Sequence, residues 1–230
     1  MSIAENLADV KQAIEEASAS AGRAPGDVRL VAVSKTWPAE RIEQAVEAGQ
    51  VLFGENKVQE ILEKVPVLPG SLEWHLIGTL QKNKVRKVLP LCSLIHSIDS
   101  LSLAERVGRV AADLGIRPQV LLQVNVADDE AKSGFSLTQI REDFGTIIAL
   151  PAIEVKGLMT VPPYSDDVEE VRPHFACLRN LRDELTEEYE VPLPELSMGM
   201  SHDFRVAIEE GATLVRVGSS IFGQRDYSQR

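Results

Sequence analysis

A single lysine, Lys35, stands at the end of the apolar run 28–34, where a buried strand would finish. An ammonium group is costly to bury, so a lysine there needs an acidic partner, a changed protonation state or a covalent attachment. Arg216 occupies a similar position near the end of the last apolar run, 213–218. For either residue alone, a side chain that reaches the solvent or pairs with an acidic neighbour is the simpler interpretation.

A short segment rich in glycine and serine follows Arg216. Gly218 permits close approach to the backbone, and Ser219 and Ser220 offer hydroxyl and amide groups at the start of a short helix. Ser201 and Asp203, which follow the preceding apolar run, can cap the next helix, and Ser201 can also face the same anion. Placed after the last two strands, these groups predict a phosphate site.

An amine beside a phosphate site suits a phosphorylated aldehyde or ketone, held by the lysine as a Schiff base. Burial and a neighbouring guanidinium would both lower the pKa of Lys35 and increase the fraction of nucleophilic, neutral amine. Pyridoxal phosphate carries the required pair of groups, and so does the substrate of a sugar-phosphate aldolase. These residues by themselves leave the two alternatives open.

The elements that must position these residues alternate between strand and helix along almost the whole chain. Apolar runs predict eight strands, at 28–34, 51–54, 74–78, 93–97, 119–125, 153–159, 195–199 and 213–218. Helical spacing lies between them, as in Leu103, Val107, Val110 and Leu114. Near-continuous Val, Ile and Leu content is typical of a parallel sheet covered by helices, and eight repeats favour closure into a barrel.

We therefore predict an α/β fold, a TIM-like (β/α)8 barrel with an extra N-terminal helix over residues 2–18. Ser2 and Glu5 have the spacing of a capping box at its start. No linker or low-complexity tract divides the chain, so we expect one domain, residues 1–230. The carboxyl ends of the strands carry the site in such barrels, and closure brings Lys35 and Arg216 together there.

Composition argues against several other classes of function. The formal net charge of −11 disfavours binding to nucleic acid or to an anionic membrane surface. No apolar segment is long enough for a membrane helix, and the N-terminus lacks the apolar centre of a signal peptide. Cys92 and Cys177 have no metal-type spacing and fit buried thiols in a reducing compartment. We expect a cytoplasmic protein without a metal site.

Three charged runs have a plain interpretation. The acidic runs 166–171 and 182–190 predict solvent-exposed faces of one helix. The basic run 81–87 predicts the exposed face of another helix. None of them identifies a partner.

Seven segments together resemble the pyridoxal phosphate homeostasis protein family. They are VAVSKTWP (31–38), FGENKVQE (53–60), EWHLIGTLQKNK (73–84), KSGF (132–135), GLMTVPP (157–163), LSMGMSHDF (196–204) and VRVGSSIFG (215–223). Members of this family are similar to the barrel domain of alanine racemase standing alone, the fold type III of pyridoxal phosphate proteins. The resemblance covers almost the whole chain, and it favours pyridoxal 5'-phosphate over a sugar phosphate.

The resemblance implies a set of cofactor-binding residues at positions that match the family's motifs. They are Lys35, Asn56, Ser201, Arg216, Gly218 and Ser219. Lys35 would hold the cofactor as a Schiff base, Arg216 would face the pyridine nitrogen, and the two serines with Gly218 would hold the phosphate. Asn56 would be a further polar contact near the ring, although a helix N-cap is at least as good an interpretation of this residue. His75 and Met159 are expected in the core or behind the site.

An arginine beside the pyridine nitrogen has a chemical consequence. A guanidinium donates a hydrogen bond without protonating the nitrogen, so the ring withdraws electrons less strongly than one paired with a carboxylate. Racemases on this barrel add a tyrosine from another domain as a second base, and Tyr164, Tyr189 and Tyr227 do not hold an inherited position of that kind. Of the three, Tyr164 follows the sixth predicted strand and is the one that can approach the site. The resemblance therefore implies no catalytic residue and a role in vitamin B6 and amino-acid homeostasis, with a weak amino-acid racemase as the alternative.

The resemblance also indicates the partners. Pyridoxal phosphate is the first of them, small amino acids are candidate ligands, and pyridoxal phosphate-dependent apo-enzymes are candidate acceptors of the cofactor. Because the additional racemase domain has no counterpart here, we expect a monomer.

Overall fold

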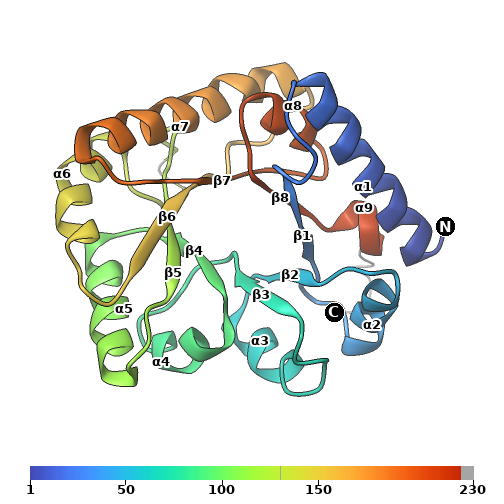
Figure 1. The fold of residues 1–230 in the computed structure, drawn as a ribbon, viewed down its shortest axis with the longest axis horizontal. Coiled ribbons are helices and arrows are strands. Elements are labelled where there is room, and N and C mark those ends of the chain that lie inside the picture. Colours follow the sequence, from blue (N-terminus) through green and yellow to red (C-terminus); the bar gives the residue numbers. More distant parts are fainter. Residues whose placement is uncertain (130, 224–230) are drawn as a thin grey trace.

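A computed structural model describes residues 1–129 and 131–223, which form a closed barrel of parallel strands with helices outside it (Figure 1). The strands are β1 (Arg29–Val33), β2 (Leu52–Glu55), β3 (Glu73–Leu76), β4 (Leu94–Ile98), β5 (Gln119–Gln123), β6 (Glu154–Met159), β7 (Glu195–Met200) and β8 (Leu214–Val217). They pair in chain order, and β8 closes on β1 with Val31 opposite Arg216. The predicted fold class and all eight predicted strands are confirmed.

The helices surround the barrel, and a first one precedes β1. They are α1 (Ile3–Ser20), α2 (Ala39–Glu47), α3 (Val58–Lys64), α4 (Val85–Val88), α5 (Leu101–Leu114), α6 (Leu137–Ile148), α7 (Val168–Tyr189), α8 (Phe204–Glu209) and α9 (Ser219–Phe222), with a 3-10 turn at Leu89–Leu91. The predicted N-terminal helix is confirmed as α1, and Ser2 and Glu5 form the predicted capping box. Its apolar face packs on α2, α8 and α9, so α1 supports the segment after β8 (Figure 1).

The inside of the barrel contains an apolar layer and a polar layer. The apolar layer consists of Val31, Leu52, Leu94, Leu121, Met159 and Leu214. On β4 and β8 the next inward residues are His96 and Arg216, which are buried and lie nearer the carboxyl ends of the strands. The polar layer is completed by His75 and Ser197, so it lies between the apolar filling and the mouth of the barrel.

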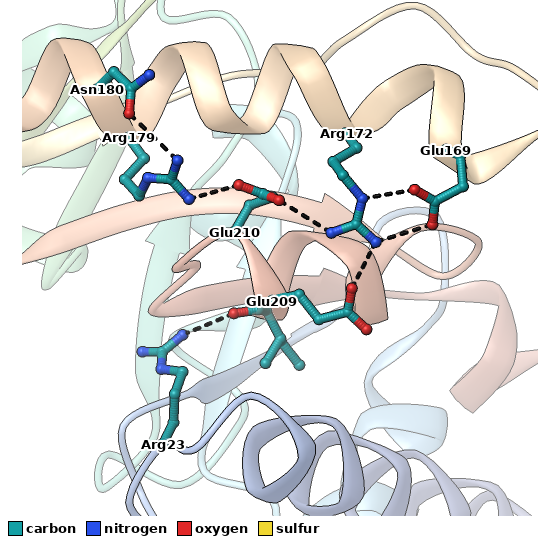
Figure 2. A network of polar contacts seen from close by, with 8 residues as sticks. Arg23, Glu169, Arg172, Arg179, Asn180, Glu209 and Glu210 are labelled. Atoms are coloured by element: carbon teal, nitrogen blue, oxygen red, sulfur yellow. Dashed lines mark hydrogen bonds and ion pairs between the residues drawn. The ribbon is translucent and has the colours of Figure 1, made fainter.

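A network of ion pairs holds α7 against the end of α8 (Figure 2). Arg172 pairs with Glu169, Glu209 and Glu210, and Arg179 pairs with Glu210, at distances of 2.5–3.0 Å. Glu169 belongs to the acidic run 166–171, which is therefore partly engaged in this network rather than simply solvated. Because α8 follows the segment that carries Ser201, the network supports the helix behind a predicted site residue.

Other surface features differ from expectation or match it only in part. The basic run 81–87 forms turns and the start of the four-residue α4 rather than one face of a longer helix. Cys92 and Cys177 are free thiols, but both are half-buried instead of buried. Within the described residues, none of the helices has the length and apolarity needed to cross a membrane.

Candidate functional site

A cavity of about 690 Å³ opens at the carboxyl ends of the strands, a volume typical of small-molecule sites. The six residues that the resemblance implies all line it, namely Lys35, Asn56, Ser201, Arg216, Gly218 and Ser219. Ser220, which the glycine- and serine-rich segment also offered for the phosphate, does not line it. A groove of about 730 Å³ at the amino ends of β1 to β3 contains none of them. Because sites on this fold lie at the carboxyl ends, the smaller cavity is the candidate site.

Lys35 lies in a tight turn two residues after β1, with its side chain half-buried. The next residue, Thr36, has a φ of 68°, a left-handed conformation that is unfavourable for a β-branched residue. Its N–H donates to Glu60 Oε2 at 2.5 Å, and the carbonyl oxygen of Ser34 accepts from Lys64 Nζ at 3.0 Å. Two side chains of α3 therefore hold the backbone on both sides of Lys35.

Behind this turn, the buried ammonium group of Lys64 lies between two carboxylates, at 2.7 Å from Glu55 and 2.8 Å from Glu60. Burial raises the pKa of Glu55 to about 7, and hydrogen bonds from Lys64 and Ser34 offset this only in part. Burial also acts to raise the pKa of Glu60, but hydrogen bonds from Lys64 and Thr36 outweigh it and lower that pKa. The ammonium group of Lys64 thus pairs with two carboxyl groups, and as pH rises Glu60 loses its proton before Glu55 does.

Substituting Glu55→Gln should change how stability depends on pH. The pKa of Glu55 is about 7 in the folded protein against an ordinary 4.5, so in this interval the folded state binds the additional proton. Relative to the variant, the wild type should lose stability as pH rises from 4.5 to 7, by at most about 3 kcal/mol. Chemical denaturation of both proteins across this range measures the effect, and a pH-independent difference would contradict the assignment.

Arg216 is buried at the end of β8, and the barrel itself supplies the acceptors that its charge requires. Nη1 donates to Ser197 Oγ at 2.5 Å and Nη2 donates to the carbonyl oxygen of Thr160 at 2.8 Å. Burial lowers the pKa of Arg216 to about 10, with Asp203 acting in the opposite direction. The guanidinium is still charged at neutral pH, and it contributes a fixed hydrogen-bond donor to the cavity wall.

The segments that follow β7 and β8 meet beside the cavity. Ser201 Oγ accepts the N–H of Gly218 at 3.3 Å, and Ser219 Oγ lies 3.2 Å from it. A Cβ at Gly218 would lie 3.1 Å from the Val33 carbonyl oxygen, so glycine lets this loop pack closely on β1. Of the two predicted caps, Asp203 occupies the N-cap position of α8, and Ser201 does not. The Asp203 side chain accepts the N–H of Met200 and makes no capping hydrogen bond to the helix.

Asn56 is half-buried and lines the cavity. The N-cap of α3 is Lys57, so the alternative interpretation of Asn56 as this cap is wrong. The loop after β3 packs closely against the backbone of Asn56. Glycine at position 78 permits this, because a Cβ there would lie 2.3 Å from the Asn56 carbonyl oxygen. His75 and Met159 are buried within the barrel and do not line the cavity, in agreement with the core role expected for them.

Sequence reasoning did not single out two aromatic side chains at the rim of the cavity, Trp37 and His202. Trp37 lines it and packs under Arg41, whose Cζ is 5.1 Å from the ring centroid. Tyr164 and His202 also line it, with ring centroids 5.5 Å apart. Trp37 and His202 each lie within two residues of a predicted site residue, a proximity that could have identified them.

The three tyrosines differ in their relation to the site. Tyr164 is exposed at the rim, and its hydroxyl donates to Asp166 Oδ1 at 2.8 Å. Tyr189 packs against Phe144 on the outer helices, with ring centroids 5.0 Å apart. Tyr227 lies outside the described residues. Of the two tyrosines whose surroundings are described, Tyr164 is the one that reaches the cavity.

Comparison with known proteins places this barrel in a family. Residues 5–226 match the family described as alanine racemase, N-terminal domain. A pyridoxal phosphate homeostasis protein of Aquifex aeolicus is 47% identical over 228 residues, which cover 99% of this chain and 100% of the relative. The protein of that name from Escherichia coli K12 is 39% identical, with 99% of each chain covered. The chain belongs to the pyridoxal phosphate homeostasis protein family. The resemblance found in the sequence motifs is therefore confirmed.

Solved structures support the same assignment. PipY of Synechococcus elongatus, solved with PLP bound, is 40% identical and superposes with a TM-score of 0.85, covering 96% of this chain and 100% of PipY. An alanine racemase of Clostridium difficile is 16% identical, with a TM-score of 0.69 over 97% of this chain and 56% of the racemase. The second likeness establishes the shared barrel fold.

Proposed function

We propose that this chain binds pyridoxal 5'-phosphate, held as a Schiff base by Lys35, and that it acts in vitamin B6 and amino-acid homeostasis. The observation that carries the proposal is the convergence of Lys35, Arg216 and the Ser201–Ser219 contact on one cavity. The names of the relatives and the PLP bound to PipY support the same ligand.

The donor set of the cavity fits each part of this cofactor. Lys35 provides the amine for its aldehyde, Ser201 and Ser219 provide hydroxyl groups for its phosphate, and Arg216 provides a cationic donor for its ring nitrogen. Asn56 provides a further amide on the same wall. When bound, the cofactor supplies a ring that can accept electrons from a bonded amine.

Loss of a phosphate-binding hydroxyl should weaken binding of the cofactor selectively. Ser201→Ala and Ser219→Ala should each raise the apparent Kd of pyridoxal phosphate about five-fold, the usual effect of one hydrogen bond. Pyridoxal, which lacks the phosphate, should bind the wild type and both variants equally. Ser220→Ala is the matched control, because Ser220 does not line the cavity. Equal weakening of both ligands would contradict the phosphate role.

Arg216 favours a role as a carrier of the cofactor over a role as a dedicated catalyst. The guanidinium leaves the ring nitrogen unprotonated, which weakens carbanion stabilisation on a bonded amino acid. Exchange of the α-proton in deuterated water, followed for a panel of amino acids, tests this directly. We expect exchange far slower than 1 s⁻¹, and turnover of roughly 1 s⁻¹ or faster would identify an ordinary enzyme.

A weak amino-acid racemase is the second candidate, and the rim of the cavity is the observation that favours it. Tyr164 and His202 line the same cavity as Lys35, so a phenol and an imidazole, both proton-transfer groups, lie at the mouth of the cavity. Hydrogen bonding to Asp166 raises the pKa of Tyr164, however, which makes its neutral form poorer at giving up the proton. If slow exchange occurs, Tyr164→Phe should abolish it.

Transfer of the cofactor to apo-enzymes is the role that follows from reversible attachment at Lys35. Holo-protein mixed with an apo-enzyme should activate it faster than free dissociation of the cofactor permits, and equal rates would exclude direct transfer. We further propose that the chain acts in the cytoplasm as a single-domain monomer. The free thiols of Cys92 and Cys177 support a reducing compartment.

A further inference from the structure

A chain of hydrogen bonds runs from Arg216 into the barrel. Arg216 Nη1 donates to Ser197 Oγ at 2.5 Å, and Ser197 Oγ lies 2.8 Å from His96 Nδ1. His96 Nε2 lies 2.9 Å from His75 Nδ1, and all four side chains are buried. The chain joins β8, β7, β4 and β3, so it crosses the interior of the barrel beneath the mouth.

The donors of Arg216 and Ser197 together give a direction to the bonds in this chain. A guanidinium only donates, so Ser197 Oγ accepts from Arg216. Ser197 keeps one proton to donate, and we assign it to His96 Nδ1 at 2.8 Å, because this direction places the buried hydroxyl proton in a hydrogen bond. His96 Nδ1 is then an acceptor, and the proton of the neutral ring is on Nε2, where it donates to His75 Nδ1. His75 is placed in the same tautomer, with its proton on Nε2.

Burial keeps both imidazoles neutral, as this direction requires. It lowers the pKa of His75 to about 3, with a smaller contribution from the charge of Arg29. Burial lowers the pKa of His96 well below its ordinary value, and the neighbouring His75 and Arg216 add to the effect. A charged imidazole would carry protons on both nitrogens and could no longer accept from Ser197.

We propose that His96 is a positioning residue for Arg216, acting through Ser197 and oriented by His75. The inference rests on the proposed function, in which Arg216 faces the pyridine nitrogen. Ser197 and the Thr160 carbonyl hold the two Nη atoms, and this fixes the plane of the guanidinium that lines the cavity. Without His96, the Ser197 hydroxyl loses its acceptor and is free to turn away from Arg216.

The tautomers provide a first test that needs neither a variant nor the cofactor. Long-range proton–nitrogen NMR correlations of histidine-labelled apo-protein distinguish an Nε2–H ring from an Nδ1–H ring. We expect His75 and His96 both as neutral Nε2–H tautomers, with assignments made by comparison with His75→Gln and His96→Gln. An Nδ1–H tautomer or a charged ring at His96 would overturn the proposal.

A double-mutant cycle on cofactor binding provides the second test. His96→Leu and Ser197→Ala should each raise the apparent Kd of pyridoxal phosphate about five-fold and shift the visible absorption band of the bound cofactor. The double variant should match Ser197→Ala alone, because both changes interrupt the same chain. The proposal would be overturned if the two increases in Kd multiplied in the double variant. It would also be overturned if His96→Leu left both the Kd and the visible absorption band unchanged.

Two further variants separate positioning from a general weakening of the barrel. His96→Gln offers an amide that can accept from Ser197 and donate to His75, so it should restore much of the lost affinity. Leu94→Val changes an inward-facing residue of the same strand outside the chain, and its Kd should stay within about two-fold of the wild type. If His96→Leu does not fold, the tautomers of His75 and His96 in the wild type decide whether the proposal holds. Failure of the wild type to bind pyridoxal phosphate would instead overturn the proposed function.

Discussion

Lys35→Ala should abolish covalent attachment of pyridoxal phosphate to this protein. The Schiff base forms between an amine and the aldehyde with loss of water, and alanine offers no amine at this position of the cavity. Titration of the apo-variant with pyridoxal phosphate should therefore not produce the visible absorption band of a protein-bound Schiff base. The contacts of Ser201, Ser219 and Arg216 remain, so weaker, reversible binding of the cofactor is expected.

The fold of this variant should be intact, because Lys35 lies in a half-buried turn at the mouth and not in the core. Its unfolding temperature should differ from that of the wild type by less than about 3 °C. Lys57→Ala is the matched control, since Lys57 is an exposed lysine after the neighbouring strand and does not line the cavity. A full absorption band in Lys35→Ala, or its loss in Lys57→Ala, would contradict the role of Lys35.

Lys64→Met should be the most destabilising substitution near the site. It removes the cation that separates Glu55 and Glu60 and leaves the buried Glu55 carboxyl and the half-buried Glu60 carboxyl without their partner. Breaking a buried ion pair from one side typically costs about 3–5 kcal/mol. Chemical denaturation at pH 7.5 measures the loss. Because Lys64 also holds the carbonyl oxygen of Ser34, the variant should bind pyridoxal phosphate more weakly than the wild type.

A second substitution tests whether the loss comes from the unpaired acids. Adding Glu55→Gln to Lys64→Met removes one of the carboxyl groups and should restore part of the stability. The loss should also be smaller near pH 5, where Glu55 is protonated because its pKa is raised by burial. Equal stability of Lys64→Met and the wild type at pH 7.5 would contradict the buried network.

Much of the architecture was predictable because both sides of a barrel strand are buried. Inward residues such as Leu214 and helix-facing residues such as Val215 are both apolar, so each strand reads as a continuous apolar run. Lys35 and Arg216 stood out as charges at the ends of such runs, and the barrel places both at one mouth.

The supporting groups were not predictable in the same way, because their neighbours are far apart in the chain. Lys64 and Glu60 have the spacing of an ordinary exposed helix pair, and it is the packing of α3 behind β1 that buries the contact of Lys64 with Glu55. His96 and Ser197 are 101 positions apart, and a single histidine in an apolar strand resembles any core histidine. The closure of the barrel brings these groups together.

Trapping of the covalent bond tests the central claim most directly. Protein saturated with pyridoxal phosphate is reduced with sodium borohydride, digested, and analysed by mass spectrometry for the lysine that carries the reduced cofactor. The account predicts a single modified lysine, Lys35, in a preparation whose visible band disappears on reduction. A preparation that stays colourless at saturation, or a label on a different lysine, would contradict it.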